Sequence, residues 1–347
     1  MNALNSAETC ATIRQNNTLR RRDLATALGS SDAALIAASI GPSARRIDFS
    51  TDRLFPADCG LGDVMALSRT ESAMHERAGV YENWHSEPHA AMVLGPEIDT
   101  RIFPKHWVRG FALRRDDLDK GPSRSLQVFD AYGPFARKVC AGEKTDLDAR
   151  DRAIDELASD DTSNGVAVSD PPPLERPKSI PAQAEPLREE WRRIKDTHQF
   201  LRLVSQLKMN WLGAYQIASA PLARQLEPKA AGQVLAKVSG DGVPIMLLVG
   251  NGGCLQIHGE PVEPLTRMGP WKNLLEPPIN PNLRDDQITE VWLAQKPTKR
   301  RMAQLVEAFG AEGRLIMQIF GLRNETADHS EAFAELAENP QFIEVTR

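Results

Sequence analysis

LQVFDAYGPFARKV (126–139) and VEAFGAEGRLIMQI (306–319) have the same pattern at two places in one chain. In each stretch, apolar and polar residues alternate, a glycine interrupts them, and the alternation resumes, which is the pattern of two strands joined by a tight turn. The matching positions lie about 180 residues apart, so this spacing predicts an internal repeat. The residues that align are Phe129 with Phe309 and Gly133 with Gly313.

Three further pairs of segments keep nearly the same spacing on either side of this hairpin. They are HWVRGFAL (106–113) with QITEVWLA (287–294), VMALSRTESAMHERAG (64–79) with IMLLVGNGGCLQIHGE (245–260), and RRDLATALGSSDAALIAA (21–38) with LRLVSQLKMNWLGAYQIA (201–218). The first two pairs have strand patterns, and the third is two helical segments joined by a polar turn. The sequence therefore predicts an α+β fold made by tandem structural duplication, each half having helices followed by a large antiparallel sheet.

A segment rich in proline, serine and aspartate, residues 155–186, separates the two copies. Apolar periodicity disappears there, which indicates a linker that cannot bury enough surface to fold. We expect an N-terminal repeat at 1–154 and a C-terminal repeat at 187–347. Diverged copies in one chain favour a ligand cleft between the halves, because domain interfaces are frequent ligand sites. The alternative is a duplication kept for stability alone.

Composition excludes several classes of protein. A net charge of −5 and only short basic clusters argue against a nucleic-acid partner. The first residues are too polar for a signal peptide, and no window resembles a membrane span, so we expect a protein that is not embedded in a membrane. The four cysteines are scattered without CxxC pairing, which favours a reducing cytoplasm over a disulfide framework or a zinc site.

Common catalytic signatures are missing: the chain has no GxSxG, HExxH, Walker loop or GxGxxG. The glycine-rich VGNGGC (249–254) lies between two strand patterns, so we interpret it as a turn rather than a phosphate loop. His75 and His258 lie near the ends of strand patterns, where exposure at a turn is the simpler interpretation. No group of histidines has the spacing of a metal site.

DTHQFL (196–201) contains the histidine that stands out. Its helical stripe predicts that His198 lies on the buried face of one continuous helix. A buried imidazole needs a partner, so the residue is either a core histidine bonded to a backbone carbonyl or a metal ligand. Haem iron suits a single histidine, because the porphyrin supplies the other four nitrogens. The stripe consists of Leu187, Trp191, Ile194, His198 and Leu201.

Several ordered motifs across both halves resemble the haem-utilisation proteins of Gram-negative bacteria, the hemin-degrading factors of the HemS, HmuS, ChuS and PhuS type. The motifs are ALSRTESAMHERAGVYEN, EIDTRIFPKHW, LQVFDAYG, DTHQFL, PIMLLVGNGGCLQIHGEPVEPL, VWLAQKPT and IFGLR. The resemblance implies a cytoplasmic protein that receives imported haem, iron protoporphyrin IX, in iron acquisition. Such a protein either opens the ring oxidatively or carries haem to a separate oxygenase. A haem ABC transporter, a reductase and a haem oxygenase are the partners it implies.

The resemblance also implies the site residues. His198 would be the proximal iron ligand, and Arg101 would approach the distal face and stabilise negative charge there, with Phe103 on the same face of a strand. The propionates would meet Lys296 and Arg323, because cations suit carboxylates. Leu248 and Phe320 would form the apolar pocket wall.

The chain departs from the family pattern in three places. Trp211-Leu212 stands where the family often has Arg-Gln, and SRTE (68–71) stands where the family has TRNE. The linker is also richer in proline and acidic residues than expected. These departures bear on ring-opening activity more than on haem binding. Three alternatives stay open: a ring-opening enzyme, a haem carrier, and a scaffold that binds no cofactor.

Overall fold

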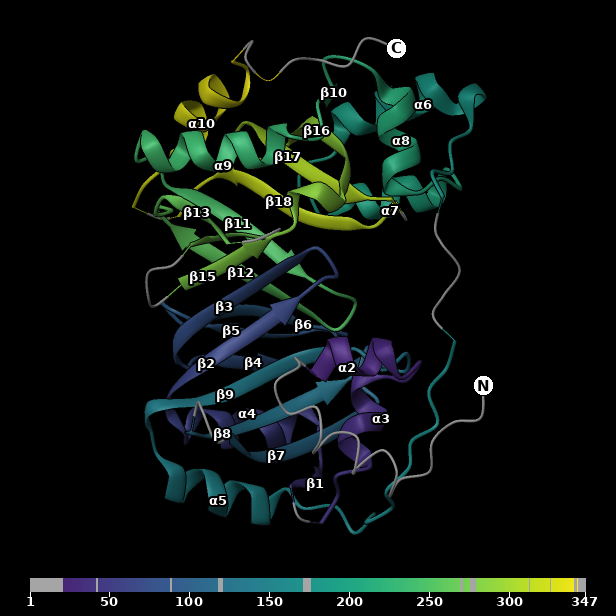
Figure 1. Cartoon of the computed structure of the whole chain (residues 1–347). Helices are drawn as coiled ribbons and strands as arrows, with labels where there is room; N and C mark the ends of the chain where they lie inside the picture. Colours follow the sequence, from purple (N-terminus) through teal and green to yellow (C-terminus); the bar gives the residue numbers. More distant parts are fainter. Residues whose placement is uncertain are drawn as a thin grey trace.

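Figure 1 shows the computed structural model, in which two sheets are stacked one above the other and the connecting segment runs along one side. The structure describes residues 21–41, 43–87, 89–117, 121–170, 176–268, 271–274, 279–311, 313–324, 326–339 and 342. The expected repeats and linker therefore extend beyond the described residues at 1–20, 171–175 and 343–347.

The strands of the described residues form two nine-stranded antiparallel sheets. The first sheet runs, edge to edge, through β1 (Ala44–Ile47), β7 (Arg109–Asp117), β8 (Gly121–Phe129), β9 (Phe135–Thr145), β2 (Gly62–Arg69), β3 (Ala73–Val80), β15 (Ile279–Leu283), β14 (Trp271–Leu274) and β13 (Leu265–Met268). The second runs through β10 (Ala223–Leu226), β16 (Ile288–Pro297), β17 (Met302–Gly310), β18 (Leu315–Gly321), β11 (Ile245–Gly250), β12 (Cys254–Glu260), β6 (Asp99–Ile102), β5 (Ala91–Leu94) and β4 (Trp84–Ser86).

The strand order shows an exchange that the sequence patterns did not predict. β13, β14 and β15 come from the second half of the chain, yet they extend the first sheet beyond β3. β4, β5 and β6 come from the first half and extend the second sheet beyond β12. The predicted α+β duplication is confirmed, but each sheet is completed by the other half, so the halves are interlocked rather than separate.

The hairpins that predicted the repeat occupy equivalent places in the two sheets. β8 pairs with β9, and β17 pairs with β18, and each pairing shifts register just before the repeated phenylalanine, Phe129 or Phe309. The turn glycines Gly133 and Gly313 both have positive φ, at 99° and 71°. Only glycine adopts this backbone region without strain, which explains why both copies have it.

Helices cover both faces of the second sheet. α9 and α10 pack on one face, and α6, α7 and α8 pack on the other over β16 and β17. None of the described helices is long and apolar enough to span a membrane. The helices are α2 (Arg21–Ala27), α3 (Asp32–Ala37), α4 (Thr51–Cys59), α5 (Leu147–Glu156), α6 (Ala184–Arg193), α7 (Gln199–Gln206), α8 (Trp211–Ala218), α9 (Ala230–Gly240) and α10 (Ser330–Ala337), with short 3-10 turns η1 (Pro104–His106), η2 (Pro181–Gln183) and η3 (Asp285–Gln287).

The predicted linker is only partly a linker. α5 and α6 occupy its two ends, and the described residues between them lack regular structure except for η2. They are nevertheless bound to the protein: the Ser169 N–H donates to the Ala131 carbonyl at 2.9 Å. At the other end, the Lys178 N–H donates to Asn210 Oδ1 at 2.9 Å. Backbone hydrogen bonds therefore hold a segment whose composition could not form a core.

Candidate functional site

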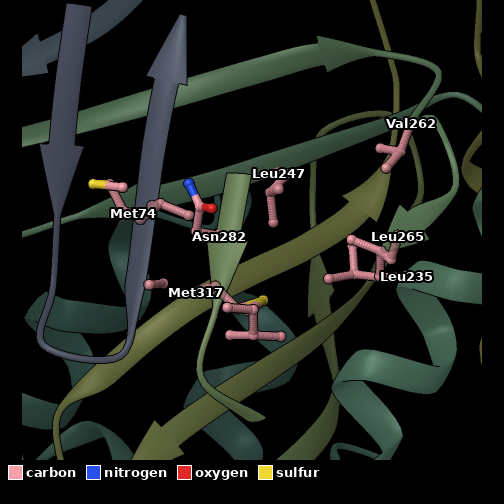
Figure 2. A pocket seen from close by; sticks show the side chains of 10 residues that line it. Met74, Leu235, Leu247, Val262, Leu265, Asn282 and Met317 are labelled. Atoms are coloured by element: carbon pink, nitrogen blue, oxygen red, sulfur yellow. The ribbon is translucent and has the colours of Figure 1, made fainter. Parts of the chain in front are cut away.

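A small cavity lies between the two sheets, where a ligand cleft between the halves was expected. Figure 2 shows a cavity of about 10 Å³ where β3 and β15 meet β11, β18 and α9. Its walls are apolar apart from Asn282, and its volume is that of about one water molecule. This cavity is too small to hold haem.

The structure corrects the prediction that His198 is buried. α6 ends at Arg193, the backbone of its cap residue Ile194 is extended, and His198 is the N-terminal cap residue of a second helix, α7. Its side chain is 93% exposed, so the apolar stripe of one continuous helix does not exist. Asp196 explains the break: its Oδ1 accepts the His198 backbone N–H at 2.8 Å, a local bond that competes with the helix.

The same carboxylate fixes the state of the imidazole. Asp196 Oδ1 lies 2.7 Å from His198 Nδ1. The backbone N–H of His198 and then its side chain lower the pKa of Asp196, so this group is a carboxylate that can only accept. Nδ1 therefore donates, which in a neutral ring leaves the lone pair on Nε2. A carboxylate behind a histidine in this way orients it for metal ligation.

One face of the second sheet brings together residues from both halves of the chain. Asp99 in β6 is opposite Ile257, Ile257 is opposite Leu248, and Leu248 is opposite Gln318. Gln318 in turn is opposite Glu307 in β17. Directly opposed residues of antiparallel strands share a face, so this row crosses the sheet on the side that carries α6–α8.

The helices leave part of this face uncovered. Their apolar contacts are with β10, β16, β17 and the start of β18, whereas Leu248 and Phe320 remain half-buried. Phe320 lies two residues along its strand from Gln318, so strand alternation places it on the same face, and it also packs against the apolar cluster that α9 and α10 cover. We call the half-buried surface formed by Arg101, Leu248, Gln318 and Phe320 the open strip. Its two apolar side chains are those that the resemblance assigned to a pocket wall.

Arg101 lies at the far end of the open strip, on the strand contributed by the first half. It pairs with Asp99, and its side chain is 31% exposed. Its strand is four strands away from that of Glu307, which is roughly 19 Å at ordinary strand spacing. Phe103 directly follows β6, which ends at Ile102, and its place beside Arg101 stays a prediction. It is half-buried, and its N–H donates to the Gly253 carbonyl at 3.1 Å.

Lys296 does not have the open position that was expected of a carboxylate-binding cation. Its side chain is 1% exposed, and its Nζ lies 2.9 Å from Glu307 Oε1, whose residue is fully buried. Aromatic rings surround the ammonium, with centroids at 4.3 Å for Trp211 and 4.7 Å for Phe200. Burial lowers the pKa of Lys296, and Glu307 opposes that effect. Arg323 is half-buried and makes a long contact of 3.4 Å to Thr298 Oγ1.

A groove of about 650 Å³ follows the outer side of α7 and α8, within the size range of small-molecule sites. Leu201, which is 54% exposed, and Trp211 form part of its apolar surface. Trp211 therefore separates this groove from the buried Lys296. Cationic side chains also line the groove: Lys178, Lys208 and Arg314.

His75 and His258 are not exposed at turns, which corrects that expectation. They lie within β3 and β12, are 0% and 3% exposed, and face each other with ring centroids 6.1 Å apart. Burial is the largest cause of the lowered pKa of both, and for His75 it reaches about 3. Beside them, Arg77 forms two hydrogen bonds, at 3.0 and 3.1 Å, with Glu260. We call this buried polar contact between the two sheets the seam.

The glycine-rich turn between β11 and β12 is confirmed as structural. Asn251 Nδ2 donates to the Arg69 carbonyl at 3.1 Å and to the Ala136 carbonyl at 3.0 Å. A Cβ on Gly253 would lie 2.6 Å from that of Ala136, so the turn needs glycine in order to pack against the first half.

Comparison with known proteins decides the family. The haemin-degrading HemS/ChuX domain matches twice, at residues 29–157 and 208–339. The chain belongs to the HemS/ChuX family. Both matches lie where the structure places the two repeats, which supports tandem duplication independently of the sequence alignment.

Relatives of this HemS/ChuX chain resemble it over most of their length. It is 32% identical to the hemin transport protein HmuS of Yersinia pestis and 31% identical to the hemin transport protein HemS of Yersinia enterocolitica, over 88% of each chain. Holo-PhuS, a heme-binding protein from Pseudomonas aeruginosa, has a similar structure, with a TM-score of 0.91, 32% identity and 98% coverage of both chains. ChuS, described as an E. coli heme oxygenase, has a TM-score of 0.86, 26% identity and coverage of 98% and 100%.

Sequence reasoning missed two residues that shape this site. Asp196 was part of the motif DTHQFL but was not linked to the histidine, although an aspartate two residues earlier can form this local bond. Glu307 interrupts the apolar run VEAF, and a charged residue among inward-facing strand positions signals a buried partner.

Proposed function

We propose that this protein binds haem through His198 and degrades it oxidatively to release iron. The observation that carries the proposal is the exposed imidazole, whose Nδ1 is held by the Asp196 carboxylate and whose Nε2 is therefore available for a metal. The similarity to proteins described as heme-binding and as hemin transport proteins supports haem as the ligand.

The open strip suits the rest of such a ligand. Leu248 and Phe320 offer apolar surface to a flat macrocycle, and Arg101 offers a guanidinium at the far end. Bound haem supplies an iron centre for oxygen chemistry. Arg101 would supply a positive charge that could stabilise negative charge developing near the iron. Arg323 remains the candidate contact for a propionate.

A carrier that delivers haem to a separate haem oxygenase is the alternative function. The curated relatives are named transport proteins, whereas one structural relative is described as an oxygenase. We place either function in the cytoplasm. Cys59, Cys140 and Cys254, the described cysteines, are free, which suits a reducing compartment. A haem ABC transporter is the proposed source, and a reductase the proposed electron donor.

Titration of the purified protein with hemin tests the ligand. We expect His198→Ala to lower affinity by about 100-fold and to shift the Soret band, because losing an oriented metal ligand costs at least as much as losing its supporting carboxylate. His85→Ala is the matched control, since His85 is an exposed histidine on β4 of the same sheet. Equal spectra and affinities for His198→Ala and the wild type would reject His198 as the ligand.

Reduction of the haem complex separates degradation from transport. With ascorbate or a reductase added and catalase present, a degrading protein loses its Soret band and releases a tetrapyrrole product. Arg101→Gln should slow this loss by about 10- to 100-fold and leave hemin affinity nearly unchanged. Haem that remains intact in the presence of catalase would favour the carrier.

A further inference from the structure

Glu307 is a hub of hydrogen bonds at the inner end of the open strip. Its Oε1 accepts from Lys296 Nζ at 2.9 Å and from Gln318 Nε2. Its Oε2 accepts from Trp211 Nε1 at 3.1 Å and from the Tyr215 hydroxyl. Four donors bind this fully buried carboxyl group, so it holds the four side chains around it.

Glu307 forms an ion pair with the nearest buried cation, Lys296. Lys296 is fully buried with Glu307 as its charged partner, and the rings of Trp211, Phe200 and Tyr215 surround the ammonium at 4.3, 4.7 and 5.4 Å. To bind a ligand's carboxylate, Lys296 would have to leave Glu307, and breaking a buried pair leaves an uncompensated charge. The inner end of the strip is therefore electrically neutral.

The neighbouring side chains do not replace the missing positive charge. Gln318 donates one amide hydrogen to Glu307, and its second amide hydrogen and its oxygen carry no net charge, so this side chain does not replace an ammonium. Trp211 uses its only polar hydrogen on the same residue, and its ring covers Lys296 from the side of the groove. Lys296, Gln318, Trp211 and Tyr215 each donate to Glu307, and the cations Lys178, Lys208 and Arg314 line the groove beside Trp211 instead.

We propose that Glu307 is a specificity-determining residue that withholds Lys296, so that this end of the site selects weakly for ligand carboxylates. This inference rests on the proposed function. The protein recognises the metal through His198 and the macrocycle through apolar surface. At this end of the site, the protein therefore binds a porphyrin with esterified carboxylates nearly as tightly as one with free carboxylates.

The test is a ratio of two affinities measured on the same protein. Iron(III) protoporphyrin IX and its dimethyl ester are titrated in the same buffer, and the selectivity is the Kd of the ester divided by the Kd of the diacid. Because both ligands meet the same folded fraction, the ratio cancels any loss of stability in a variant. Glu307→Gln should raise this ratio by about ten-fold, since it releases the ammonium to a charged acceptor.

Two further variants separate the explanations. Lys296→Met in the otherwise native chain should leave the ratio within about two-fold, and Lys296→Met/Glu307→Gln should return it to the wild-type value. An unchanged ratio in Glu307→Gln, or a ten-fold fall in Lys296→Met, would show that Glu307 does not withhold the lysine. Failure of the wild type to bind either porphyrin would instead reject the proposed function.

Discussion

Helices pack over one face of the first sheet and over the equivalent face of the second, but only the second face is left partly exposed. On the second sheet, α6–α8 cover β16 and β17 and leave the open strip half-buried. On the first, α3 packs over β7, β8 and β9, and Val166 of the connecting segment packs against the same apolar cluster. The part of the connecting segment around Val166 therefore covers this face of the first sheet, whereas α6, at the other end of the segment, lies over the second sheet.

Equivalent positions on the two faces differ in chemistry. By sheet register, Leu67 corresponds to Leu248 and Asn282 to Arg101, and both first-sheet residues are less than a tenth exposed. Gln127 corresponds to Glu307, and it donates to Ser125 Oγ at 2.8 Å without any charge. Duplication thus preserved the scaffold, while the position of the buried, charged Glu307 is taken by the neutral Gln127 in the first sheet.

Breaking the buried Lys296–Glu307 pair should give the largest difference in stability between a variant of the second sheet and the matched variant of the first. Lys296→Met leaves the Glu307 carboxylate buried without its charged partner, so we expect a loss of about 3–5 kcal/mol in the free energy of unfolding. Gln127→Leu, the matched change in the first half, should cost about 1 kcal/mol. Urea denaturation followed by circular dichroism measures both. Similar losses of stability in the two variants would contradict a larger role for the charged Lys296–Glu307 pair than for the neutral Gln127.

Acid should weaken the seam that joins the faces. His75 has a folded pKa of about 3, below its ordinary value of 6.5, so the unfolded chain binds the proton more tightly. This contribution is complete above pH 6.5 and is lost as the pH falls from 6.5 towards 3, and the loss amounts to about 2 kcal/mol at pH 5. His258 acts in the same direction, with Arg77 and Glu260 as the charges beside it.

Unfolding midpoints measured at pH 7 and pH 5 check this effect. His75→Gln should lower stability at pH 7 and make it less dependent on pH, whereas His85→Ala should keep the wild-type slope. An equal pH dependence in His75→Gln would exclude the seam as its source. Because both halves contribute to the seam, we expect one cooperative transition at both pH values.

Removing the orienting carboxylate should have the smallest effect. Asp196→Asn retains an acceptor for the His198 N–H but removes the charge that fixes the ring, so we expect hemin affinity to fall by about ten-fold. Asp52→Asn is a control, because Asp52 is an exposed aspartate on α4 of the first half. Hemin titration of both variants measures the difference, and a wild-type affinity for Asp196→Asn would reject the orienting role.

The sequence predicted those features that local patterns encode. Alternation and glycine spacing predicted the hairpins around Gly133 and Gly313, and the constant offset predicted the duplication. The exchange of β4–β6 with β13–β15 was not predictable, because strand alternation does not specify which sheet a strand joins. His198 was chosen correctly as the exceptional residue of its segment, but its burial was wrong because a single side-chain bond from Asp196 overrode helical periodicity. Its role as the ligand stays a prediction.

The reciprocal exchange of three strands has the geometry of a domain-swapped dimer whose two subunits share one polypeptide. Each half contributes three strands to the other half's sheet: β4–β6 from the first half and β13–β15 from the second. Either half expressed alone would therefore expose the edge of β3 or β12, and its own three exchanged strands would have no sheet to join. Such fragments should be prone to aggregate singly and to assemble with each other when mixed. In the fused chain, each set of exchanged strands is at high effective concentration relative to the sheet that it joins. The connecting segment therefore links the two halves in addition to packing on the first sheet.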